Sequence, residues 1–103
     1  MISNKIIAFY LLLLLSVTTS FSQEKFTLSG VITAAKSNET VIGVNVVIGS
    51  IKAFTTTNEY GFYSITVPKG TYKVTVSSIG FQTEEITLDL NKNTKYNFSL
   101  TES

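Results

Sequence analysis

Four short pieces between residues 43 and 81 decide the fold of this chain: Gly43-Val44-Asn45-Val46, Thr57-Asn58-Glu59-Tyr60-Gly61-Phe62-Tyr63, Val67-Pro68-Lys69-Gly70-Thr71-Tyr72 and Val76-Ser77-Ser78-Ile79-Gly80-Phe81. In each piece β-branched or aromatic residues meet turn residues, and the pieces follow one another at close intervals. This pattern is typical of a small antiparallel β-sandwich. Because no segment after residue 22 keeps a 3.6-residue apolar period, we predict an all-β domain over residues 23–103.

Alternation of apolar and polar residues, followed outward from these pieces, predicts a seven-stranded antiparallel β-sandwich, because successive side chains on a strand point to opposite faces. The pattern places Tyr63 inside and Phe62 outside in one strand, and it places Tyr96 and Phe98 inside in the last strand. The threonine-rich strand 51–57 is expected at a sheet edge. The predicted strands cover residues 26–33, 41–49, 51–57, 62–67, 72–76, 84–90 and 95–100.

Turn residues between these strands have identifiable backbone roles. Gly61 is the residue of its turn that is able to adopt a positive φ, and Asn58 is expected to cap that turn by accepting a backbone hydrogen bond. Pro68 and Gly70 occupy the second and fourth positions of a predicted type I turn. Gly80 permits a bulge or close packing in the bend that contains it.

Residues 1–22 have the pattern of a secretory signal peptide. Lys5 supplies a positive charge, residues 6–15 form an unbroken apolar run, and Ser20 and Ser22 are the small residues before a cleavage site. A helix of that run is about 15 Å long, whereas a bilayer core is about 30 Å thick, so a membrane anchor is the poorer interpretation. We predict cleavage before Gln23 and no transmembrane span in the mature chain.

The composition of the predicted mature chain excludes several classes of function. Without Lys5, seven lysines balance seven acidic residues, and arginine is absent, so the basic surface of a nucleic-acid binder is missing. Histidine and cysteine are also absent, which removes the usual general base, thiolate nucleophile and zinc ligands. The sequence therefore predicts no cofactor, no metal site and no disulfide.

The acidic residues do not form a catalytic pair in the predicted fold. Glu84 and Glu85 are neighbours in a strand and point to opposite faces, while Glu85 and Asp89 share a face at about 13 Å separation. Glycosidase carboxylates lie only about 5–9.5 Å apart. We interpret these acids as solvated edge charges that discourage aggregation, and we predict that the domain is not an enzyme.

Three aromatic residues are predicted to lie outside the core. Alternation and turn position expose Phe54, Tyr60 and Phe62. Exposed aromatic side chains serve protein partners as well as glycans, and an uncovered sheet edge serves a protein partner that adds a strand. These residues, together with the edge at 51–57, are therefore the candidate contact residues for a protein partner or a glycan.

The order and spacing of the four pieces resemble the carboxypeptidase-regulatory-like domain. The family's turn carries Thr-Asp-x-x-Gly, and here Asn58 replaces the aspartate, so a role in calcium coordination is not expected. Gly43 matches the family's glycine at the start of the second strand. The residues that carry the resemblance are, in order, Gly30-Val31, Ile42-Gly43-Val44, Thr57 to Tyr63, Pro68, Gly70, Tyr72 and Ile79-Gly80-Phe81.

This resemblance implies a transthyretin/prealbumin-like sandwich that accompanies other domains and performs no catalysis. In Bacteroidetes-type bacteria the domain is familiar as the N-terminal periplasmic extension of TonB-dependent outer-membrane receptors. It therefore implies an exported module, in the periplasm or at the outer membrane, with a protein partner in the cell envelope. The alternative is a stand-alone carbohydrate-binding module, because the sandwich also resembles starch-binding-like modules. A plug and barrel encoded beyond Ser103 would favour the receptor-associated interpretation.

Overall fold

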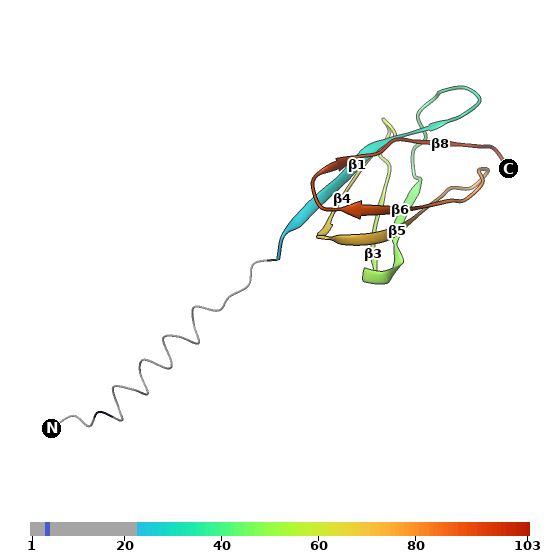
Figure 1. The fold of residues 1–103 in the computed structure, drawn as a ribbon. Coiled ribbons are helices and arrows are strands. Elements are labelled where there is room, and N and C mark those ends of the chain that lie inside the picture. The colour runs from blue at the N-terminus through green and yellow to red at the C-terminus, as the bar shows by residue number, and fades with distance from the viewer. Residues whose placement is uncertain (1–3, 5–22) are drawn as a thin grey trace.

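The computed structural model describes residue 4 and residues 23–103, so the predicted leader and its cleavage site lie outside the described residues, apart from Asn4. From Lys25 onward the chain forms strands, turns and one short 3-10 turn (Figure 1). Among the described residues, no helix is long and apolar enough to cross a membrane. The elements are β1 (Lys25–Ala34), β2 (Asn45–Ile48), η1 (Gly49–Ile51), β3 (Ala53–Thr56), β4 (Phe62–Pro68), β5 (Gly70–Ser77), β6 (Glu84–Leu90), β7 (Thr94–Lys95) and β8 (Phe98–Leu100).

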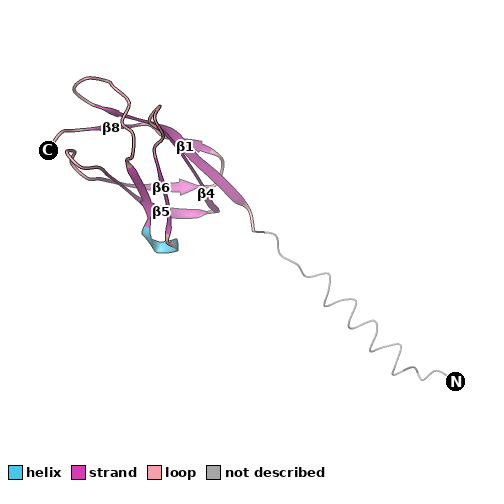
Figure 2. Cartoon of the chain, turned by 180° about the vertical axis from the view of Figure 1, so that it is seen from behind, coloured by secondary structure: helices cyan, strands magenta, loops and turns pink. Residues whose placement is uncertain are grey.

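The strands form two sheets that share one core. In the first sheet the order is β4-β1-β7, with β8 also pairing with β1, and in the second it is β3-β2-β5-β6. The turn η1, cyan in Figure 2, links β2 to β3 at one end of the second sheet. Both sheets contribute to the core, whose fully buried side chains include Leu28, Ile32, Val46, Ile48, Tyr63, Val74, Val76, Leu90 and Leu100. Residues 25–103 therefore form an all-β sandwich.

Alternation predicted the inward faces of β4 and β5 correctly. In β4, Tyr63, Ile65 and Val67 are buried while Phe62 lies outside, and β5 alternates in the same way. Strand β3 lies at the edge of its sheet, as the threonine-rich sequence indicated. These strands each have one face against the core and one toward water, which is the arrangement that a period of two reports.

The predicted last strand differs from the observed one in number, direction and burial. It is split into β7 and β8, and both run parallel to β1, so the sandwich has eight strands and is not purely antiparallel. The side chain of Asn97, rather than a strand backbone, accepts a hydrogen bond from Val31 N at 2.9 Å. Next to this break in the ladder, Tyr96 is not buried in the core as predicted. Its side chain is 37% exposed, and its ring centroid lies 4.8 Å from that of Phe98.

Two other predicted segments need correction. The strand predicted at 41–49 begins only at Asn45, because Ile42 and Gly43 form a turn in which Gly43 has φ +75°, and it ends where η1 begins. Pro68 and Gly70 do not close a hairpin. Strands β4 and β5 belong to different sheets, and the single residue between them, Lys69, bends the chain from one sheet to the other.

A glycine and two tyrosines fix the contact between β1 and the chain after β7. An ideal Cβ on Gly30 would lie 1.9 Å from the carbonyl oxygen of Tyr96, so only glycine allows this approach. Tyr63, the cross-strand partner of Gly30, donates its hydroxyl to the same oxygen. Burial, together with the nearby Tyr96, raises the pKa of Tyr63 well above its ordinary value, so the hydroxyl stays protonated and keeps donating.

Candidate functional site

The link between β3 and β4 carries Tyr60 and leads directly into Phe62, the first residue of β4. Buried Thr57 anchors its start. The Thr57 hydroxyl accepts a hydrogen bond from Val44 N at 2.9 Å and donates one to Val41 O at 2.6 Å. Its backbone N–H donates to Val44 O at 3.0 Å, and its carbonyl accepts from Gly43 N at 3.0 Å. The link is therefore held to the residues just before β2 by four hydrogen bonds.

Asn58 caps the turn that follows. Its Oδ1 accepts from the backbone N–H groups of Tyr60 at 2.9 Å and Phe62 at 3.1 Å. Its backbone N–H donates to Phe62 O at 3.0 Å, and its carbonyl accepts from Gly61 N at 2.9 Å. An asparagine side chain hydrogen-bonds the backbone of the following residues in this way without adding charge. The Asn58 cap therefore holds the backbone of the turn that carries Tyr60.

Gly61 lets this turn lie against β1. Its φ is +73°, and an ideal Cβ would lie 2.7 Å from Ile32 O and 2.9 Å from the Cβ of Thr40. The carbonyl of Gly61 accepts from Ile32 N at 2.9 Å. Both the backbone conformation and the space therefore require glycine here.

Two exposed aromatic side chains lie in the capped turn and at the strand position that follows it. Tyr60 is 70% exposed and Phe62 is 43% exposed. Across the ladder, Phe62 is opposite Val31, which is half-buried. We call these three residues the aromatic corner. Its backbone is fixed by the Asn58 cap and by β1, so a partner meets these side chains without first ordering the loop.

Phe54 does not join the aromatic corner. It is 73% exposed, but it lies on β3 in the second sheet, whereas Phe62 lies on β4 in the first. Each points away from the core of the sandwich, so the two rings face different surfaces. The three predicted contact residues are all exposed, and two of them, Tyr60 and Phe62, lie two positions apart at the Asn58 turn and the start of β4. Their contact role remains a prediction.

The rest of the first sheet's outer face is rich in hydroxyl groups. Next along the β1–β4 ladder after the pair of Phe62 and Val31 come two cross-strand pairs on the same face, Ser64 with Ser29 and then Thr66 with Thr27. The hydroxyls of Thr66 and Thr27 are 2.8 Å apart and share a hydrogen bond. The face thus changes from aromatic at one end to hydroxylated at its centre.

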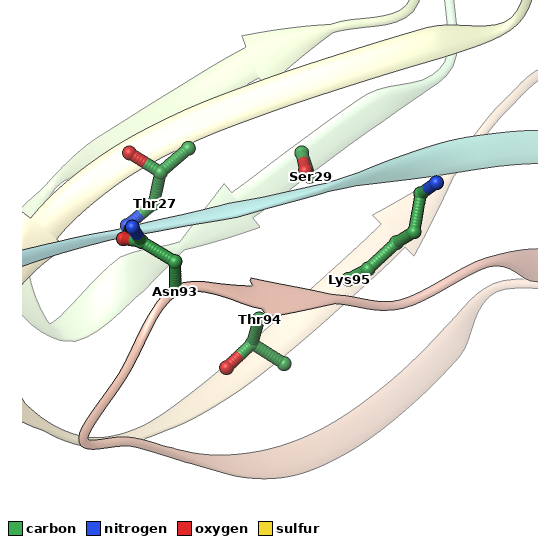
Figure 3. A pocket seen from close by; sticks show the side chains of 5 residues that line it. All are labelled: Thr27, Ser29, Asn93, Thr94 and Lys95. Carbon is green, nitrogen blue, oxygen red and sulfur yellow. Dashed lines mark hydrogen bonds between the residues drawn. The ribbon is translucent and has the colours of Figure 1, made fainter.

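Beside these pairs lies a shallow hollow of about 330 Å³ (Figure 3). Oδ1 of Asn93 accepts from Thr27 N at 2.9 Å, which leaves its amide N–H groups free to donate. In Figure 3, Asn93 and Lys95 project toward β1, while Thr94 points the other way. The hollow therefore offers hydroxyls, one amide and one ammonium, and none of its lining residues is acidic. These lining residues are Thr27, Ser29, Asn93, Thr94 and Lys95.

The remaining turn residues named in the sequence analysis shape the backbone of turns and of the bend between the sheets. Gly43 and Gly80 have φ values of +75° and +90°, and a Cβ on either would meet no atom within 4 Å. Gly70 lies against the Tyr72 ring, whose hydroxyl donates to Pro68 O at 2.7 Å and braces the bend between the sheets. None of these residues belongs to the aromatic corner or the hollow.

The charged side chains show no catalytic arrangement among residues 23–103. Nζ of Lys73 lies 3.2 Å from Glu85, and both side chains are well exposed, so the pair contributes little to stability. The described residues contain no group of three or more His, Cys, Asp or Glu side chains able to hold a metal ion. Of the three carboxylates on β6, Glu85 and Asp89 are exposed and Glu84 is half-buried.

Sequence reasoning missed the hydroxylated hollow and two exposed isoleucines. The hollow depends on the parallel pairing of β7 with β1, which no local pattern reports. Ile42 and Ile79 lie in turns and are 65% and 101% exposed, because their turns project from the sandwich. The one available signal was Gly30, whose position inside a strand marks a close backbone approach.

These features define a small β-sandwich with exposed aromatic side chains and a hydroxyl-lined hollow on one of its sheets. The chain belongs to the CarboxypepD_reg-like domain family, which matches residues 28–103. Membership of this family indicates a noncatalytic β-sandwich module. None of the curated proteins matches the sequence.

Solved structures with a similar fold come from very different proteins. A chain in a type II cohesin–X-dockerin complex from Acetivibrio cellulolyticus has 22% identity and a TM-score of 0.61, over 71% of this chain and 52% of that one. A DUF3823 family protein from Bacteroides ovatus has 20% identity and a TM-score of 0.59, over 77% and 44%. A 3-chlorocatechol 1,2-dioxygenase from Rhodococcus opacus has 10% identity and a TM-score of 0.62, over 80% and 62%.

At these identities the likeness is one of fold alone. The chain spans about half the length of the first two of these structures. The dioxygenase shows that the same sandwich also occurs inside an enzyme, so a function for this chain has to be argued from its own surface.

Proposed function

We propose that this chain is an exported, noncatalytic interaction module that contacts a protein partner in the cell envelope, in association with TonB-dependent outer-membrane uptake systems. The aromatic corner is the observation that carries the proposal. Two exposed aromatic rings at a capped turn are the type of anchor that dominates protein–protein binding energy. Family membership and the signal-like first 22 residues support the envelope location.

Export gives the first test. We expect the protein recovered from the periplasm or outer-membrane fraction to begin at Gln23, because Ser20 and Ser22 are the small residues that a signal peptidase needs before its cleavage site. Intact-mass spectrometry measures this directly. A mature mass that still contains residues 6–15 would overturn the leader and restore the membrane anchor.

The partner contact gives the second test. We expect the double variant Tyr60→Ser, Phe62→Ser to lose its envelope partner, with binding roughly 30-fold weaker if the two rings together supply about 2 kcal/mol. The measurement is affinity capture from an envelope extract, quantified by mass spectrometry and followed by titration of the recovered protein. Because both side chains are exposed, the variant should keep its fold.

The matched control is Phe54→Ser, which removes an equally exposed ring from the other sheet. It should retain the partner at the wild-type level. Equal recovery by the double variant and the wild type would count against the aromatic corner. Loss of the partner in the Phe54→Ser control would move the contact to β3.

The hollow of Figure 3 favours one alternative, a stand-alone carbohydrate-binding module. Its hydroxyl and amide groups suit sugar hydroxyls, and Phe62 lies on the same outer face to stack on a sugar ring. One solved structure with this fold, at 17% identity and a TM-score of 0.53, is a putative carbohydrate binding protein from Bacteroides uniformis. Saturable oligosaccharide binding that Asn93→Ala and Phe62→Ser abolish would replace the protein-partner proposal.

A further inference from the structure

The two sheets have four open edges, and two of them are guarded. Strand β6 carries Glu84, Glu85 and Asp89, whose charges oppose the addition of another strand. On the far side of the first sheet, β7 and β8 have only two and three residues. There the side-chain oxygens of Asn93 and Asn97 accept hydrogen bonds from the backbone N–H groups of Thr27 and Val31 in β1, so these groups are not free to pair with another strand. Both guards are devices that natural sheets use against edge pairing.

The other two edges lack charged guards. Strand β4 reads Phe-Tyr-Ser-Ile-Thr-Val-Pro over seven residues, and β3 reads Ala-Phe-Thr-Thr. Neither strand contains a charged residue, and the two lie beside each other on the same side of the sandwich. The longer one, β4, has no strand on its outer side in the part of the chain that the structure describes.

The register of β4 shows which backbone groups face this open edge. Ile32 N donates to Gly61 O, so alternation turns the backbone groups of Tyr63, Ile65 and Val67 toward β1. The groups of Ser64 and Thr66 therefore point outward, and both residues are exposed. No bond to another described residue is found for these groups.

Both ends of the edge are closed. The N–H and carbonyl of Phe62 are bonded to Asn58, and Pro68 lacks an N–H while its carbonyl accepts from the Tyr72 hydroxyl. The free part of this edge is thus Ser64 to Thr66, with two N–H and two carbonyl groups. A strand that pairs there must offer two carbonyl groups and two N–H groups at the matching positions.

We propose that a second copy of this chain pairs with β4, antiparallel and edge to edge, with Ser64 opposite Thr66 of the second copy. This register satisfies all four free groups on each copy and places Ile65 at the twofold axis. A twofold contact uses the same surface on both partners, and an uncharged β-branched strand is the partner that this edge fits. The association uses the backbone edge of β4, whereas the envelope contact proposed above uses the side chains of Tyr60 and Phe62, so different variants test the two.

The charges around β4 favour a second copy. Lys69 follows one end of the strand, and Glu59 precedes the other in the Asn58 turn. Antiparallel pairing brings the Lys69 end of one copy beside the Glu59 end of the second copy, twice per pair. The mature chain also has balanced charge, so the copies do not repel each other strongly.

Sedimentation equilibrium of the exported protein, at concentrations up to about 1 mM, tests the proposal because edge-only contacts are small. We expect the average mass to rise toward that of a dimer. Ser64→Pro removes one donor, and Ser64→Lys adds a guard; each should weaken the association at least about tenfold. Ser99→Lys, an equally exposed serine on β8 at the guarded edge, should leave it unchanged.

Amide hydrogen exchange provides a readout that needs no variant. The N–H groups of Ser64 and Thr66 should exchange more slowly as concentration rises, while those of β3 should not change. A monomer at every concentration, or a dimer that both Ser64 variants leave intact, would overturn the proposal. Protection of Ser64 and Thr66 only when envelope extract is added, with the protein itself monomeric, would instead assign the edge to a foreign strand.

Discussion

Gly30→Val is expected to destabilise the domain by more than about 3 kcal/mol, which is above the loss that most substitutions cause. An ideal Cβ at this position lies 1.9 Å from the carbonyl oxygen of Tyr96 and 2.7 Å from its carbonyl carbon. That carbonyl cannot move away freely. It accepts the hydroxyl of Tyr63, while Tyr96 N donates to Ser29 O at 2.8 Å.

Urea unfolding of the two proteins measures the loss, and Gly49→Ala supplies the control. Gly49 has no atom within 4 Å of its ideal Cβ and no positive φ, so its replacement should change the free energy of unfolding by less than about 0.5 kcal/mol. A Gly30→Val protein as stable as the wild type would mean that the chain between β7 and β8 does not lie on β1 as described.

The sequence pattern predicted those parts of the fold that depend on residues close together in the chain. Strands β4 and β5 each bury every second residue, so the period of two identified Tyr63 and Tyr72 as core residues. The turn from Asn58 to Gly61 was equally predictable, because a side-chain cap and a positive φ are properties of the residues themselves. In these segments sequence and tertiary structure require the same residues.

The errors arose where the partner strand decides the outcome. The pattern at 95–100 fits a buried strand, yet it does not state that the strand runs parallel to β1 or that Asn97 interrupts the ladder. Proline and glycine at 68 and 70 have the same turn chemistry whether the chain closes a hairpin or passes to the other sheet. The type of element was predictable, and its pairing was not.

The candidate site shows the same division. Exposure of Phe54, Tyr60 and Phe62 followed from alternation and turn position, and all three side chains are exposed. Their grouping did not follow, because it depends on which sheet each strand joins. The hollow beside Thr27 was not predictable for a related reason: its residues lie 66 positions apart along the chain.

Gly61→Val is expected to be the second most damaging substitution, because it combines two separate costs. A β-branched residue at φ +73° is strained by about 1–3 kcal/mol. The new Cβ would also lie 2.7 Å from Ile32 O, in a buried position where the backbone of β1 cannot yield without losing its bond to Gly61. The total loss should therefore exceed about 1 kcal/mol by a clear margin.

Two variants separate these costs in the same urea experiment. Gly43→Val has a similar φ of +75° but an ideal Cβ with no atom within 4 Å, so it should show the backbone strain alone. Phe62→Ser, the neighbour of Gly61, should lose least, because its side chain faces outward from β4. The expected order of destabilisation is Gly61→Val, then Gly43→Val, then Phe62→Ser. If Phe62→Ser instead proved more damaging than Gly61→Val, the ring of Phe62 would have to contribute to the core, and the aromatic corner could not be a free binding surface.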